Sequence, residues 1–132
     1  MTQGNKYLFD EYPLIVLPTL AVKVGLHEAI ITQQIHYWMH HEPLHEHDGR
    51  LWVYNSYPEW HKQMPFMTPK VIKDAIIHLE RLGVLVTGNY NKLKIDRTKW
   101  YSIDYDRLQI LTGSNNPDTP SDAQVRPSDA QV

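Results

Sequence analysis

Apolar residues recur at three- and four-residue spacing between residues 69 and 82, which is the pattern of an amphipathic helix. The apolar positions are Val71, Ile72, Ala75, Ile76, Leu79 and Leu82. Thr68 is a suitable N-cap, Pro69 falls at the first helical position, and Gly83 is a common C-terminal stop. The sequence therefore predicts a capped helix with one buried face. Its outward face contains Lys70, Lys73, Asp74, Ile77 and Arg81.

A shorter helix is predicted immediately before it, over residues 57–63. Ser56 and Glu59 form a capping box, in which each side chain can accept a free backbone N–H at the helix start. Met64 precedes a proline and is therefore disfavoured in the helical region, so the helix should stop there. The two helices follow each other with only a sharp turn between them.

Beyond Gly83 the period changes to the alternation that is typical of strands, over residues 84–90 and 99–105. The intervening loop and its exit hold the densest positive cluster of the chain: Lys92, Lys94, Arg97 and Lys99. A further strand is predicted to begin near Trp52. The order strand, short helix, turn, long helix and basic hairpin is that of a winged helix-turn-helix, so we expect an α+β fold, mainly α, with a β-hairpin wing.

An additional N-terminal helical segment is predicted over residues 19–24, which Gly25 interrupts, and over residues 26–40. In the second helix the residues near one face are Leu26, Ile30, Gln33 or Gln34, Tyr37 and Trp38. We expect that face to support the helix-turn-helix, with the two aromatic residues in the core rather than in a ligand site.

The chain has 132 residues and a net charge of only −2, but its charge is unevenly distributed. Residues 1–67 contain 4 basic and 7 acidic side chains, whereas residues 68–101 contain 7 basic and 3 acidic ones. Positive charge therefore concentrates where the long helix and the loop are predicted, as expected of a nucleic-acid footprint. Two explanations of this charge need no nucleic acid: a solvated helix face, and a loop whose lysines keep a sheet edge soluble.

Five histidines lie within residues 36–47, and two of them, His36 and His40, are spaced to share one helix face. That spacing can chelate zinc or nickel, but the ligand spacing of a zinc module is missing. Our default interpretation is an exposed loop with pH-dependent charge, without metal.

Other classes are disfavoured by what the sequence lacks. It has no cysteine, no apolar run long enough to span a bilayer and no signal-peptide pattern at its start, so we expect a cytoplasmic protein away from the membrane. No phosphate-binding glycine loop and no arrangement of nucleophile and base is recognisable, so we expect neither an enzyme nor a cofactor.

We expect one DNA-binding domain over residues 1–112 and a disordered tail over residues 113–132. The tail repeats its sequence at a seven-residue period, with PSDAQV at 120–125 and again at 127–132. The repeat can be slippage in a tolerant linker. Alternatively it is a pair of binding sites in the gene, because seven codons span about two turns of B-DNA at about 10.5 base pairs per turn.

Together these strings resemble the N-terminal winged-helix domain of replication initiators and replisome organisers of phages, plasmids and integrative elements of Gram-positive bacteria, the DnaD-like group. The strings are 25–30 (GLHEAI), 33–38 (QQIHYW), 52–55 (WVYN), 65–66 (PF) and 96–101 (DRTKWY). The resemblance covers residues 10–108, roughly the whole domain. It implies recognition of repeated sites in double-stranded DNA at an origin. The DNA-contacting positions that it implies are Thr68, Lys70, Lys73, Ile77, Arg81, Lys92, Lys94, Arg97 and Lys99.

In that family a further C-terminal region recruits the replicative helicase or its loader. Only a short segment and the repeat-bearing tail follow residue 105 in this sequence, so we expect either a truncated form or a small stand-alone member, and helicase recruitment does not carry over. A homodimer or higher assembly on repeated sites and contacts with replication proteins are expected. Two other functions stay open: a winged-helix transcription regulator of a mobile element, and a protein-interaction domain that binds a host protein.

Overall fold

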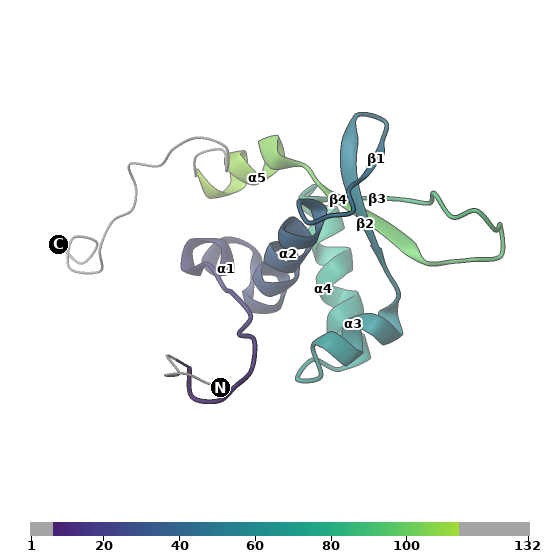
Figure 1. Ribbon diagram of the computed structural model, residues 1–132. Coiled ribbons are helices and arrows are strands. Elements are labelled where there is room, and N and C mark those ends of the chain that lie inside the picture. The colour runs from purple at the N-terminus through teal and green to yellow at the C-terminus, as the bar shows by residue number, and fades with distance from the viewer. Residues whose placement is uncertain (1–6, 114–132) are drawn as a thin grey trace.

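The computed structural model describes residues 7–113 and, within that range, places five helices and four strands (Figure 1). In chain order they are α1 (Pro18–Val24), α2 (Leu26–Met39), β1 (His45–His47), β2 (Arg50–Asn55), α3 (Tyr57–Gln63), α4 (Pro69–Arg81), β3 (Leu85–Gly88), β4 (Lys99–Ile103) and α5 (Tyr105–Thr112). The α+β class expected from the sequence is confirmed. Of the predicted tail, only Gly113 belongs to the described residues.

The four strands form one antiparallel sheet in the order β1-β2-β4-β3. The central pair is in register from Val53 opposite Tyr101 to Asn55 opposite Lys99. Because β2 pairs with β4 and not with β3, the chain leaves the sheet after β2, forms α3 and α4, and returns to the far edge. Both helices therefore lie, in chain order, between two strands of the same sheet.

The core lies between α2, α4 and one face of the sheet. On α4, Ile72, Ala75, Ile76 and Leu79 are buried, as the periodic pattern predicts. Trp60 of α3 is fully buried, and its ring meets that of Tyr101 edge-on at 6.0 Å between centroids. Burial raises the pKa of the Tyr101 phenol above its ordinary value.

Both predicted helices of the N-terminal segment are present within one residue of their expected bounds, but the buried face of α2 was predicted wrongly. Leu26 and Tyr37 are more than half exposed. The buried residues are Ala29, Ile31, Thr32, Ile35 and Met39. Apolar residues surround most of this helix, so their spacing does not single out one face. Of the aromatic pair, only Trp38 packs against the core, where it contacts Trp60.

The predicted strands around the basic loop are too long. β3 ends at Gly88. β4 ends at Ile103, because Asp104 caps the start of α5 by accepting a hydrogen bond from the Arg107 backbone N–H at 3.0 Å. Tyr105 is therefore the first residue of a helix and not the last of a strand. This helix was not predicted from the sequence.

The histidine-rich tract is not simply an exposed loop. Residues 45–47 form β1, which pairs with β2 through a tight turn at Asp48 and Gly49, both with positive φ. The ring of His47 stacks on Tyr90 at 4.1 Å and lies edge-on to Trp100. Aromatic packing on the outer face of the sheet therefore fixes this hairpin, which charge and spacing alone did not predict.

No described helix has the length and apolar character needed to cross a membrane.

We predict that Ile76→Ala, which truncates a side chain with no exposed surface, lowers the free energy of unfolding by about 2–5 kcal/mol through lost burial and a residual cavity. Urea denaturation of the full chain measures the change. Val22→Ala on α1 is the matched control, because Val22 is 82% exposed and the same kind of truncation there should change stability by less than about 0.5 kcal/mol. Equal effects of the two substitutions would contradict the placement of the core.

Candidate nucleic-acid interface

The start of α4 presents Thr68 and Lys70 on the surface. The Thr68 hydroxyl accepts a hydrogen bond from the Val71 backbone N–H at 3.2 Å, so it is an N-cap as predicted. The Lys70 ammonium lies 2.7 Å from a carboxylate oxygen of Asp74, one helical turn further on. That hydrogen bond raises the pKa of Lys70, and the carboxylate offsets part of its charge.

Lys73 and Arg81 are exposed, and neither forms an ion pair with another residue in the described range. Ile77, predicted to stand exposed at the middle of this face, is instead partly buried. His78 occupies the neighbouring surface position, and its Nδ1 lies 2.6 Å from a carboxylate oxygen of Glu28. This contact between α4 and α2 was missed in the sequence because its partners are 50 positions apart.

The loop between β3 and β4 spans residues 89–98 and exposes Lys92, Lys94 and Arg97, as the sequence predicts. Two apolar side chains alternate with these cations: Leu93 is 67% exposed and Ile95 is 85% exposed. Figure 1 shows the loop extending far beyond the paired parts of β3 and β4. The loop therefore offers both charge and apolar contact away from the core.

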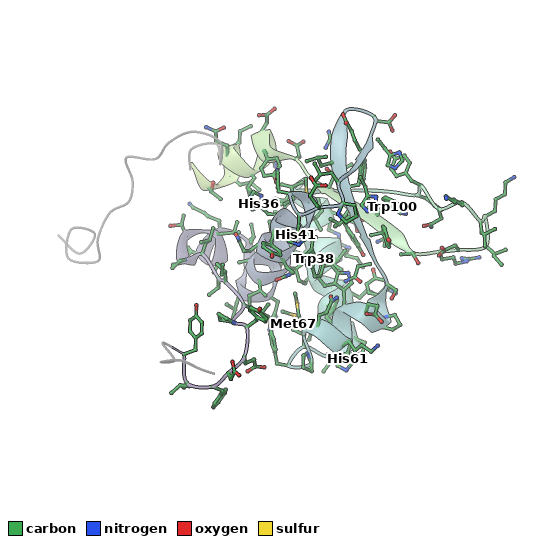
Figure 2. The ribbon with its side chains drawn as sticks, viewed as in Figure 1. His36, Trp38, His41, His61, Met67 and Trp100 are labelled. Atoms are coloured by element: carbon green, nitrogen blue, oxygen red, sulfur yellow. The ribbon has the colours of Figure 1, made fainter. Side chains whose placement is uncertain are left out.

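Asn91 anchors this loop. Its side-chain N–H₂ donates to the carbonyls of Asp96 and Thr98 at 2.9 and 2.8 Å, and its carbonyl accepts from the Trp100 indole N–H at 2.8 Å. Trp100 lies at the base of the loop (Figure 2) and is almost fully buried among Tyr54, Tyr90 and the β1 histidines. One amide thus ties the two ends of the loop to the sheet.

Asp96 stabilises the return of the loop. Its carboxylate accepts a hydrogen bond from the Thr98 backbone N–H at 3.0 Å, which lowers the pKa of Asp96. The end of the loop and the first residue of β4, Asp96 to Lys99, lie beside the first turn of α3, where the two segments border a shallow cavity of about 300 Å³. Arg97 is thereby placed next to the start of the first helix of the helix pair.

Lys99 differs from the other predicted contact residues. It belongs to β4, is about one-third exposed, and its ammonium lies 3.5 Å from a carboxylate oxygen of Glu80 and 6.0 Å from the centre of the Tyr57 ring. Its position links β4 to α4 and α3. Lys99 is therefore less exposed than the three loop cations, and a carboxylate and an aromatic ring already contact it.

The two histidines that share one face of α2 contact other protein groups. His36 Nδ1 lies 2.7 Å from the Tyr105 hydroxyl, and His40 Nδ1 lies 2.9 Å from the His36 carbonyl oxygen. Across residues 7–113, no group of three or more histidine, aspartate or glutamate side chains is arranged to hold a metal ion. The structure gives these histidines a packing role between α2 and α5.

Comparisons with protein-family models, with curated proteins and with solved structures found no match.

We predict that Asn91→Ala lowers the free energy of unfolding by about 1–3 kcal/mol, because the buried Trp100 indole loses its acceptor. It should also increase proteolytic cleavage within residues 89–98. Denaturant unfolding and limited proteolysis measure the two effects. Lys92→Ala, at the adjacent exposed position, serves as the control and should change neither. Unchanged cleavage in the Asn91 variant would show that another contact holds the loop.

Proposed function

We propose that the chain is a winged helix-turn-helix protein that binds double-stranded DNA in a sequence-specific manner. The strand order β2-β4-β3, with α3 and α4 inserted between β2 and β3, supports this assignment. The single observation that carries it is that one domain presents both an exposed, partly basic face of α4 and an exposed basic loop. Duplex DNA offers a groove that can accept the helix and phosphates that can bind the basic loop.

In this proposal α4 is the recognition helix. Its 13 residues correspond to about 20 Å at about 1.5 Å per residue, which is long enough to lie in the major groove. Lys73 is the best candidate for reading base edges, because it lies in the N-terminal half of α4, is exposed and forms no ion pair with another described residue. Lys70, which Asp74 already holds, is better suited to a phosphate.

The β3–β4 loop is then the wing. Its cations Lys92, Lys94 and Arg97 would contact phosphates, while Leu93 and Ile95 supply apolar side chains of the kind that minor-groove binders place against base steps. Anchoring by Asn91 favours binding, because a loop already fixed at its base loses less conformational entropy on contact.

We further propose origin recognition in replication initiation as the biological role, acting in the cytoplasm on repeated sites and together with replication proteins. This step is supported by the resemblance of the sequence strings to replication initiators and by the tandem repeat of the chain. DNase footprinting across the chain's own gene tests it. Protection of repeats inside the coding sequence favours initiation, whereas protection confined to a promoter would replace this role by transcriptional regulation. Equal affinity for the gene and for a random duplex would contradict sequence-specific binding.

We predict that Lys92→Ala, Lys94→Ala or Arg97→Ala weakens binding to all duplexes alike and reduces the slope of log affinity against log salt by about one unit each. The physical reason is that a variant with one phosphate contact fewer releases fewer counterions from the DNA when it binds. Fluorescence anisotropy over a salt series measures the slope. Lys23→Ala on α1 removes an exposed cation outside the proposed interface and should leave the slope unchanged.

We predict a different effect for Lys73→Ala: a loss of about 1–3 kcal/mol for the preferred site and a much smaller loss for a random duplex, so that discrimination falls. Competition titrations with the two duplexes measure the ratio of affinities. If the ratio is the same as for the unchanged chain, α4 does not read base edges and the assignment of the recognition helix is wrong.

A further inference from the structure

The tip of the β3–β4 loop exposes two large aliphatic side chains to solvent. Leu93 is 67% exposed and Ile95 is 85% exposed, and they are two positions apart. Lys92 and Lys94 alternate with them, and neither lysine forms an ion pair with another described residue. A loop that only keeps a sheet edge soluble accounts for the lysines but not for the aliphatic residues between them, because water disfavours exposed aliphatic surface.

The tip is a tight turn on a fixed base. The Asp96 backbone N–H donates to the Leu93 carbonyl at 3.1 Å, which closes a turn with Lys94 and Ile95 at its centre. At the base, the Asn91 side chain bonds to both ends of the loop. A loose loop would fold away from a close-packed surface, whereas these hydrogen bonds hold the two aliphatic side chains outward.

Stacked bases are the apolar surface of duplex DNA, and the minor groove gives access to them. Proteins that bind in this groove insert leucine, isoleucine or similar side chains between neighbouring base pairs, which unstacks that step and kinks the duplex. Cations beside the inserted side chains contact the phosphates. The loop tip has both parts, since Leu93 and Ile95 can enter a base step while Lys92 and Lys94 lie next to the phosphates.

The energy of unstacking decides where such an insertion occurs. Pyrimidine–purine steps such as TpA unstack and kink readily, whereas runs of adenine are stiff. The minor-groove edges of A·T and T·A pairs present the same acceptors, so hydrogen bonds in that groove barely distinguish TpA from ApA. A preference for TpA at the loop would therefore report the deformation of the DNA and not a contact with a base edge.

We propose that the tip of the β3–β4 loop is an apolar wedge that enters the minor groove at a pyrimidine–purine step and kinks the duplex there. The wedge rests on the proposed DNA binding and adds to it a class of preferred target and a bend in the bound DNA. Figure 1 shows the loop reaching beyond the sheet on the side away from α1 and α5, so these helices do not obstruct its tip.

Two short duplexes that are G·C-rich outside one central step provide the test. They differ only in whether two A·T pairs at the centre form a TpA or an ApA step. One preparation of each carries 2-aminopurine as the second base of that step, because its fluorescence rises when the base unstacks. Another carries a dye at each end, because energy transfer between the dyes rises when the duplex bends. Fluorescence anisotropy at low salt measures binding of the full chain to the same duplexes.

The double variant Leu93→Ala, Ile95→Ala removes the wedge and leaves Lys92 and Lys94 in place. Both sites are exposed, so its thermal unfolding should match that of the unchanged chain. Ile110→Ala on α5 is the matched control, because Ile110 is 72% exposed and lies outside the proposed interface.

At saturation, the unchanged chain and the control should raise 2-aminopurine fluorescence and energy transfer severalfold more with the TpA duplex than with the ApA duplex. The double variant should bind with the same salt slope and give neither signal. Binding without these signals, equal signals from the two duplexes, or an unaltered signal from the double variant would overturn the wedge and leave the proposed DNA binding intact. Absence of binding in the anisotropy measurement would overturn the proposed function and the wedge with it.

Discussion

Ile72, Ile76 and Leu79 of α4 have no exposed surface, and their packing against the rest of the core fixes the orientation of the helix. Because side chains repeat every 3.6 residues around a helix, burying this face leaves Lys73 and Arg81 outside. The contact between His78 and Glu28 joins α4 to α2 at the edge of the same packing surface. The positions of the outward side chains of α4 therefore depend on the apolar contacts behind them.

The position of the basic loop depends on the opposite side of the sheet. There Trp52, Trp100, Tyr90 and His47 form a second apolar layer, and Gly88 leaves room for it: a β-carbon at this position would lie 3.1 Å from Tyr90 and 3.4 Å from Trp52. Asn91 connects that layer to the loop. The two proposed DNA-contacting surfaces are thus held by different sets of contacts on one sheet.

Local signals predicted α3 and α4 well, because caps and prolines act within a few residues: Ser56 and Thr68 cap the helices as expected. Signals that depend on distant partners were missed or misinterpreted. β1 exists through pairing with β2, and Lys99 is engaged by Glu80, 19 positions away. The buried face of α2 and the helix α5 were missed for a related reason, since their apolar residues suit more than one arrangement until the neighbouring elements are in place.

DNA binding through α4 and the β3–β4 loop is tested most directly by mapping the residues that duplex DNA contacts. Amide chemical shifts of the ¹⁵N-labelled full chain, recorded during titration with a duplex at low salt, report that surface. If α4 and the β3–β4 loop bind DNA, the largest changes occur in the N-terminal half of α4 and in residues 89–98, while α1 and α5 change little. Changes confined to α1 and α5, or no change with any duplex, would contradict it.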